Sequence, residues 1–431
     1  MSEYTMDEMQ EEFAPQEDAQ PTIERRAIRR KRAKWPYVEL NIDVPLLLIV
    51  FVLLVFGVLM VYSASWDFSL QNSGDSTAMF QRQLFTMSVG IGAAIVASFI
   101  DYRIYRKYAV FLIGAAAAAL LAVLIINEVR YGSARALSEG SYMPGEVAKV
   151  ATIIYLSVWL TAKRGELGKW AYGLLPMGAI VGLMAGLILL QPDLSAAATI
   201  VVLGGLLFFL AGGDLKQIGL MLGAVTVVGL LVVAFSATGR ARMSSYLLTL
   251  ENPTQANYHV LRSFEAFVKG GWFGVGLGQS EAKLTGLPVP PTDSIFAVVG
   301  EELGLIGSSV LVILYALLLW RALSIARRAP DMMGSLLAAG IGIWITMEAF
   351  INMAVMVGLV PFAGNALPLI SYGGSNLVAT LAALGILTNI ARVSHGQHQR
   401  EERILDATTR GRRGERGRGL SRTRRAARAG R

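Results

Sequence analysis

The sequence predicts an all-α, polytopic membrane protein with about ten transmembrane helices. Of the 431 residues, 54% are hydrophobic, and the mean hydropathy is +0.51. Only 16% of the residues are charged, whereas about a quarter are charged in a soluble domain. Apolar runs recur along the chain, and each can cross the ~30 Å hydrocarbon core of a bilayer as a helix. The chain contains no cysteine, which excludes disulfides and thiolate metal sites.

Ten apolar runs define the predicted spans and the domain organisation. They lie at 43–63, 83–100, 108–127, 146–162, 173–190, 195–211, 215–236, 295–320, 335–360 and 371–392. The segment between the seventh and eighth runs, about 237–294, predicts a large loop on one side of the membrane. We expect 43–392 to form the membrane domain. The acidic, then basic, segment 1–42 and the arginine-rich segment 393–431 are expected to be largely disordered tails.

The short loops between the predicted spans lie alternately on the two sides of the membrane, and lysine and arginine are distributed unequally between these two sets of loops. One set holds Arg103, Arg106, Lys107, Lys163, Arg164, Lys169, Lys216, Arg321, Arg327 and Arg328, whereas the other holds only Arg82, Arg130 and Arg135. The positive-inside rule therefore predicts that both termini are cytoplasmic. The large loop, with Asp293 at its end, is then expected on the outer face.

Both predicted tails carry clusters of basic residues. Arg25, Arg26, Arg29, Arg30, Lys31, Arg32 and Lys34 precede the first span, and eleven arginines fall between Arg403 and Arg431. Next to a membrane span, such clusters favour anionic lipid head groups over nucleic acid. Solvated tails that only fix the orientation of the protein are the simpler alternative.

Polar residues within or beside the spans carry more information than the apolar ones, because burying them in a bilayer is costly. They are Glu146, Lys149, Gln191, Asp193, Asp293, Glu301, Glu302, Glu348 and Asn352. Glu146 and Lys149 are three residues apart on a helix and close enough to pair. From the sequence alone, the two residues could form a structural ion pair between helices or belong to a functional site. Glu301 and Glu302 are expected to pair inside the bundle or to be protonated.

Two aspartates stand where helices are expected to begin. Asp193 follows Pro192 in a very short turn, which is typical of turn chemistry and of a helix cap. Asp293 follows Pro290 and Pro291 and precedes an apolar run. An acid at this place also gains from the helix dipole. From spacing alone, capping is favoured over catalysis at Asp293.

Four stretches of the chain, in order, resemble motifs of the SEDS family (shape, elongation, division and sporulation), which includes FtsW and RodA. They are "GSARALSEGSYMPGEVAKVATIIYLS" (132–157), "QPDLSAAAT" (191–199), "YHVLRSFEAFVKGGWFGVGLGQSEAKLTGLPVPPTDSIFAVVGEELGLIG" (258–307) and "INMAVMVGLVPFAGNALPLISYGGSNLVATLAALGILTNIAR" (351–392). The similarity runs through 43–392 and excludes the tails. The stretch from Tyr258 to Lys283 is more similar to the FtsW branch than to RodA.

The resemblance implies a peptidoglycan glycosyltransferase in the bacterial cytoplasmic membrane. Its substrate would be lipid II, a disaccharide-pentapeptide on undecaprenyl pyrophosphate, polymerised at the outer face for septal wall synthesis in cell division. A RodA-like role in elongation and cell shape is the alternative. Asp293 matches the family's essential acid and is expected to act as general base on the acceptor 4-hydroxyl. Arg135, Arg262 and Lys283, or a divalent cation such as Mg²⁺ or Mn²⁺, would stabilise the leaving pyrophosphate.

The resemblance also implies roles for the other polar residues. Glu146 and Lys149 would line a central cavity. Further candidates for the cavity or for substrate binding are Asp193, Ser263, Ser371 and Tyr372, and the acids expected to be structural are Glu301, Glu302 and Glu348. The chain departs from the family pattern at Pro291, where His is usual, at Ala136, where Trp is common, and at Arg262 and Glu348, where Gln is common.

The resemblance implies partners as well: a class B penicillin-binding protein that cross-links the product, and other divisome proteins. Two other functions suit a polytopic protein with intramembrane acids. One is a flippase that transports lipid II, and the other is a non-catalytic divisome scaffold that recruits the transpeptidase. Transporters often contain paired internal repeats, and the sequence shows no convincing one, which disfavours the flippase.

The predicted topology can be tested by cysteine labelling, because the chain has no cysteine of its own. A membrane-impermeant maleimide added to intact cells should label Gln279→Cys in the large loop and should not label Thr409→Cys in the basic tail. The opposite pattern would place Asp293 on the cytoplasmic side and would contradict the predicted orientation.

Overall fold

The computed structural model describes residues 42–397, apart from 131–142, 192, 253 and 255. The described chain is helical and contains no strand. Its α-helices are α1 (Val44–Ser73), α2 (Ala78–Phe99), α3 (Tyr105–Arg130), α4 (Pro144–Ala162), α5 (Leu174–Leu189), α6 (Leu194–Leu210), α7 (Leu215–Phe235), α8 (Ala237–Glu251), α9 (Tyr258–Gly270), α10 (Ile295–Arg328), α11 (Met332–Met356) and a final helix, Gly374–Gln397. Short 3₁₀ turns lie at Tyr102–Ile104 and Arg164–Glu166.

Each of the ten predicted spans lies largely on a helix, which confirms the all-α membrane fold. Eight of the described helices are long and apolar enough to cross a membrane. The other two, α5 and α6, are apolar but have only 16 and 17 residues. The count of ten spans therefore stays a prediction.

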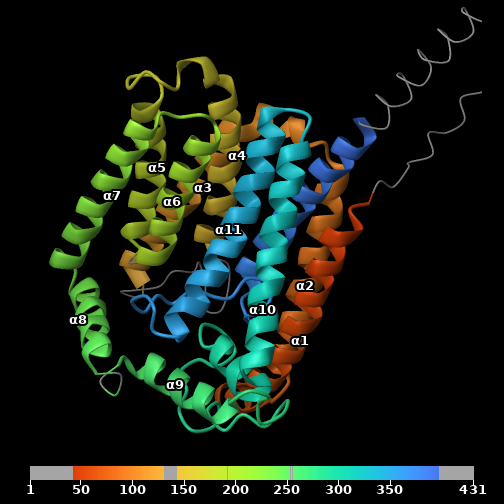
Figure 1. Ribbon diagram of the computed structural model, residues 1–431, viewed down its shortest axis with the longest axis vertical. Coiled ribbons are helices and arrows are strands. Elements are labelled where there is room, and N and C mark those ends of the chain that lie inside the picture. The colour runs from red at the N-terminus through yellow and green to blue at the C-terminus, as the bar shows by residue number, and fades with distance from the viewer. Residues whose placement is uncertain (1–41, 131–142, 192, 253, 255, 398–431) are drawn as a thin grey trace, which may run out of the picture. The chain divides into compact units, whose positions relative to one another are not determined.

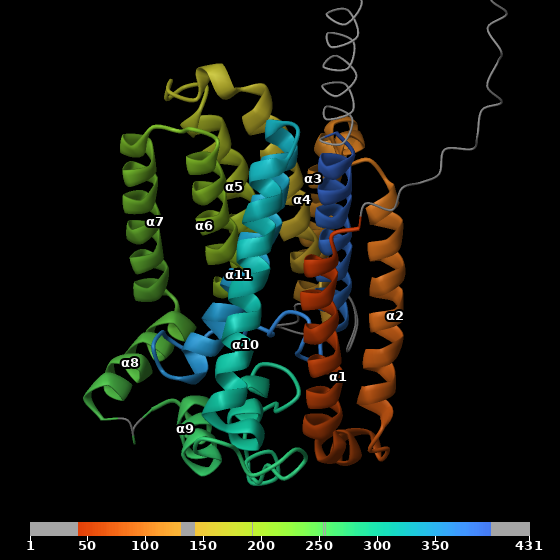
Figure 2. The same cartoon turned by 45° about the vertical axis from the view of Figure 1, so that its right-hand side comes forward.

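The segment predicted as a large loop contains two helices, α8 and α9. In both views these helices lie in the lower half of the described chain, whereas the start of α1 and the end of the final helix lie in the upper half (Figures 1 and 2). The two ends of the described chain are thus on the same side of the helix bundle, opposite α8 and α9. This agrees with an even number of crossings between them.

Helices α10 and α11 pack against each other, and the other helices that build the site pack around them. Small residues allow the close approach, as is usual for helices in a bilayer. A Cβ atom on Gly342 of α11 would lie 2.3 Å from Cβ of Ala322 on α10. A Cβ atom on Gly270 of α9 would lie 2.0 Å from the carbonyl oxygen of Gly300 on α10. The face of α11 toward the bundle is therefore almost fully buried.

Helix α10 is kinked at Gly304, which has φ +67°. The glycine-rich loop after α9 pairs the backbone groups around the kink: Val275 and Gly276 donate to the carbonyls of Glu301 and Glu302, and Leu305 and Ile306 donate to the carbonyls of Gly271 and Trp272. The kink therefore has a definite cause, because the loop replaces part of the helical ladder. The loop is fixed to α10 through the same bonds.

The side chains of Glu301 and Glu302 serve the same junction and do not pair with each other. Glu301 accepts hydrogen bonds from the Ser280 hydroxyl and from the amide of Ala282 at 3.1 Å. Glu302 accepts from Ser63 at 2.5 Å and forms an ion pair of 2.9 Å with Lys283. The structural role expected for both acids agrees with these contacts, since each acid has partners within the helix bundle and the partner of Glu302 is the cation Lys283.

The kink provides a test of the fold. Gly304→Ala should lower the melting temperature of the purified protein in detergent, because an L-residue is strained at φ +67° and its Cβ would lie 2.6 Å from the Trp272 backbone. Strain of this kind alone costs about 1–3 kcal/mol. Gly114→Ala in α3 is the control, since its Cβ would meet no atom within 4 Å. Equal melting temperatures for the two variants would contradict the account of the kink.

Candidate active site

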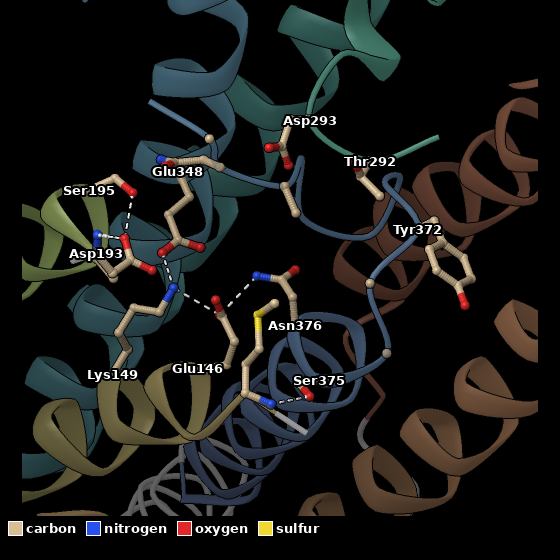
Figure 3. A pocket seen from close by; sticks show the side chains of 17 residues that line it. Glu146, Lys149, Asp193, Ser195, Thr292, Asp293, Glu348, Tyr372, Ser375 and Asn376 are labelled. Carbon is tan, nitrogen blue, oxygen red and sulfur yellow. Dashed lines mark hydrogen bonds and ion pairs between the residues drawn. The ribbon is translucent and has the colours of Figure 1, made fainter. Parts of the chain in front are cut away.

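One cavity of about 390 Å³ gathers most of the polar residues that the sequence singles out. Its wall is built by α4, α6, the segment before α10, α11 and the stretch 364–376 (Figure 3). Its lining includes Glu146, Lys149, Asp193, Ser195, Thr292, Asp293, Glu348, Asn365, Tyr372, Ser375 and Asn376. We call it the acidic cavity, since its described lining has four carboxylates and one cation, Lys149.

Lys149 lies between two carboxylates. Its Nζ is 2.8 Å from Glu146 Oε2, as the i,i+3 spacing predicts, and it also forms a close ion pair with Glu348 of α11. The side chains of Lys149 and Glu348 are 3% and 5% exposed. Asn376 of the final helix donates to Glu146 Oε2 at 2.9 Å. The group therefore ties together α4, α11 and the final helix.

Glu348 was expected to be a structural acid, and the structure places it in the wall of the cavity beside Lys149. A single lysine cannot neutralise both of its carboxylate neighbours. The group thus carries a net negative charge when all three side chains are ionised. Such a charge attracts cations and cationic centres of a substrate and repels anions.

Asp193 is the N-cap of α6. Its Oδ1 accepts from the amide of Ala196 at 3.1 Å and from the hydroxyl of Ser195 at 2.9 Å. The predicted capping role is confirmed, and the residue lines the acidic cavity as well. Asp193 therefore caps α6 and lines the acidic cavity at the same time.

Asp293 lies one residue before the N-cap of α10. The helix begins at Ile295, and Ser294 is the N-cap, with no hydrogen bond from its own side chain to the helix. The carboxylate of Asp293 faces the cavity (Figure 3). Its Oδ2 would lie only 2.9 Å from a Cβ atom on Gly364, so glycine at 364 leaves room for the carboxylate. The position of Asp293 favours a role in the cavity over capping.

The side chain of His259 lies behind this segment. Its ring stacks on Phe362 with 4.4 Å between centroids, and its Nδ1 is 3.4 Å from the Ser294 hydroxyl. Burial lowers the pKa of the His259 imidazole. The neutral ring is therefore favoured next to the start of α10.

Three predicted substrate residues lie outside the cavity lining. Arg262 pairs with Glu265 at 2.6 Å on α9, and the buried Ser263 donates to the carbonyl of His259 at 2.8 Å. Lys283 is held by Glu302. The contact of Arg262 and Lys283 with a pyrophosphate stays a prediction, and in this structure each of the two cations pairs with a carboxylate outside the cavity lining. Arg135 lies outside the described residues.

The segment 364–376 supplies cavity residues that sequence reasoning missed. Asn365, Ser375 and Asn376 line the cavity beside Tyr372, which was predicted, whereas Ser371 is buried behind the wall. The signal was present in the polar and glycine-rich run "GNALPLISYGGSN", but its contact with α4 is more than 200 residues distant in sequence. The described residues contain no group of three or more acids and histidines that could hold a metal ion alone.

The sequence matches the family described as "Cell cycle protein" (FtsW, RodA, SpoVE) over residues 44–396. A protein of Trichlorobacter lovleyi named "Probable peptidoglycan glycosyltransferase FtsW" is 38% identical over 361 residues, which cover 83% of this chain and 94% of that protein. "Stage V sporulation protein E" of Bacillus subtilis is 36% identical over 357 residues, covering 82% of this chain and 97% of that protein.

Two solved structures share the fold. A chain described under "Structural coordination of polymerization and crosslinking by a peptidoglycan synthase complex" has a TM-score of 0.67 at 25% identity, covering 82% of this chain and 98% of that chain. The rod shape determining protein RodA of Thermus thermophilus has a TM-score of 0.60 at 25% identity, covering 81% of this chain and 97% of that chain.

The ion-paired group of Glu146, Lys149 and Glu348 can be tested through the stability of the protein. Lys149→Met leaves the buried carboxylate of Glu348 and the partly buried one of Glu146 without their cation, and removal of one partner from a buried ion pair costs about 3–5 kcal/mol. We expect a lower melting temperature in detergent, partly restored by Lys149→Met combined with Glu348→Gln. Lys163→Met, which breaks a surface pair with Glu166, is the control, with an expected cost below about 1 kcal/mol. A Lys149→Met protein as stable as this control would show that the group does not hold the helices together.

Proposed function

The chain belongs to the FtsW/RodA/SpoVE family, and from this membership we propose that it is a peptidoglycan glycosyltransferase. Its substrate is lipid II, which it polymerises into glycan strands at the outer face of the cytoplasmic membrane for septal wall synthesis. Support comes from the relatives named FtsW, which match along nearly their full length. The observation that carries the proposal is the Asp293 carboxylate in the wall of the acidic cavity.

The proposed reaction joins two sugars. The 4-hydroxyl oxygen of the acceptor attacks the anomeric carbon of the donor, and the bond from that carbon to the undecaprenyl pyrophosphate oxygen breaks with inversion. The hydroxyl proton passes to Asp293, which acts as general base, and the electron pair leaves with the pyrophosphate. A carboxylate can do this when it lies within about 3 Å of the hydroxyl. The pyrophosphate is a stabilised anion, so the step needs no acid opposite Asp293, in contrast to a two-carboxylate glycosidase.

The charge of the cavity suggests which part of the substrate enters it. Four carboxylates with a single lysine disfavour a pyrophosphate and suit neutral sugar hydroxyls, which can donate hydrogen bonds to them. We propose that the sugars occupy the acidic cavity while the pyrophosphate stays toward the head-group region. A divalent cation that accompanies the pyrophosphate would add positive charge there. The described acids do not preform a site for such an ion, so no step is assigned to it.

The proposal also includes partners and location. One structural neighbour belongs to a complex that couples polymerization and crosslinking, and we propose that this chain likewise works with a class B penicillin-binding protein and with other divisome proteins. Both termini would be cytoplasmic, with the basic tails against anionic lipid. The arrangement of α8 and α9 opposite the described ends of the chain supports the placement of both termini on one side of the membrane, and the distribution of Lys and Arg selects the cytoplasmic side.

The general base can be tested by substitution of a single atom. Asp293→Asn keeps the shape of the side chain but removes its basicity, so the rate of lipid II polymerisation by the purified protein should fall by about 10²–10⁴-fold. Asp293→Glu should also be slow, since a displacement of 1 Å can cost about 10²-fold. Asp67→Asn at the end of α1, whose carboxylate accepts from Gln71, is the control and should retain the parent rate.

A well-folded Asp293→Asn protein with close to the parent rate would contradict the assignment. The flippase and the scaffold would become the better explanations if the purified parent protein itself did not polymerise lipid II. Lipid II transport into the outer leaflet of proteoliposomes would separate those two.

A further inference from the structure

The backbone before α10 is held at three successive carbonyl groups. The amide of Tyr372 donates to the carbonyl of Pro291 at 2.7 Å. The hydroxyl of Ser371 donates to the carbonyl of Thr292 at 2.6 Å. The side-chain amide of Asn352 donates to the carbonyl of Asp293 at 2.9 Å. All three donors come from α11 or from the turn before the final helix, and we call them the carbonyl clamp.

Asn352 is completely buried on α11, one turn after Glu348. Its Nδ2 donates to two carbonyls, those of Asp293 and of Asn365 at 2.5 Å. The opposite orientation of the amide would set its oxygen against both carbonyls, so the geometry assigns the nitrogen to this side. The other atom, Oδ1, is buried without a hydrogen-bond partner among the described residues. A buried acceptor without a partner is unfavourable. The two hydrogen bonds that the amide donates must therefore outweigh this cost, and they explain why Asn stands at position 352.

Ser371 is fixed from several sides. It is buried, its hydroxyl accepts from the amide of Leu367 at 2.7 Å, and Gln83 of α2 donates to its carbonyl at 3.3 Å. The turn itself is strained, because Leu369 has φ +69°. A Cβ atom on Gly57 of α1 would lie 2.4 Å from the carbonyl oxygen of Leu369. The turn therefore presses closely on α1 and has little freedom to move.

We propose that Asn352 and Ser371 are positioning residues for Asp293. They hold the backbone of residues 292 and 293 so that the carboxylate projects into the acidic cavity, and they join it to the helix that carries Glu348. The inference rests on the proposed function, in which Asp293 is the general base. It assigns no contact with substrate to either residue. Gly364 completes the arrangement, since a Cβ atom at this position would lie 2.9 Å from Asp293 Oδ2 and crowd the carboxylate.

A positioning role differs from ordinary packing in one measurable respect, because a positioning residue acts only through Asp293. Ser371→Ala should lower kcat for lipid II polymerisation about 10-fold, and Asn352→Ala about 10²-fold, since misplacement by 1 Å can cost that much. KM should stay close to that of the parent for both variants. Asn352→Ala also leaves two carbonyls without their donor and should lower the melting temperature in detergent. Ser371→Thr keeps a hydroxyl and should restore most of the rate.

Ser65→Ala is the matched control. Ser65 lies on α1, is buried, and its hydroxyl has no partner among the described residues. No hydrogen bond joins Ser65 to the clamp among the described residues, so removal of its hydroxyl should leave kcat unchanged. If Asn352→Ala fails to fold, the positioning role is tested with Ser371→Ala and Ser371→Thr alone. These substitutions remove one hydroxyl group or add one methyl group, so they change the fold least.

The decisive measurement combines each variant with Asp293→Asn. In that background the base is already absent, and the residual rate should not fall further when Ser371→Ala or Asn352→Ala is added. A further fall by the same factor as in the parent would overturn the inference, as would parent kcat values for both single variants. If Asp293→Asn alone keeps the parent rate, the assignment of Asp293 as general base fails, and that result is distinct from a failure of the clamp.

Discussion

The rest of the site depends on the ion pairs of Lys149 inside the helix bundle. A buried lysine needs a carboxylate partner, because an unpaired charge in a medium of low dielectric is strongly unfavourable. Here it has two, Glu146 on its own helix and Glu348 on α11. These ion pairs join α4 to α11 and place polar side chains between the two helices. The acidic cavity is the space that this constraint leaves, and its remaining wall is formed by segments that pack around the same two helices.

The second constraint is the backbone before α10. The prolines at 290 and 291 have no amide hydrogen, so this segment is ordered through its carbonyls, and those carbonyls are met by donors from Asn352, Ser371 and Tyr372. The glycine-rich loop pairs with α10 about two to three turns further along, around the Gly304 kink. Asp293 thus stands between two junctions of the chain, on a rigid support suited to a catalytic group.

The local features of this arrangement could be predicted, and the distant ones could not. The helical runs, the spacing of Glu146 and Lys149 and the cap at Asp193 follow from periodicities of a few residues. The pairing of Glu348 with Lys149 spans 199 residues, and no pattern within one helix encodes it. Arg262 and Lys283 were predicted to lie near a phosphate because they are cationic, and that role stays a prediction; the structure shows each of them paired with a carboxylate, on α9 and on α10 respectively. The clamp was hidden for the same reason: its acceptors are main-chain carbonyls, which carry no side-chain signature.

The central claim is that the acidic cavity binds the sugars of lipid II with a hydroxyl against residue 293. A cryo-EM structure of the Asp293→Asn protein with lipid II bound would test it most directly, since this variant should retain substrate. The account predicts the disaccharide in the cavity, with a sugar hydroxyl within about 3 Å of the side chain at 293. A disaccharide bound elsewhere on the protein, with the cavity empty of sugar, would contradict it.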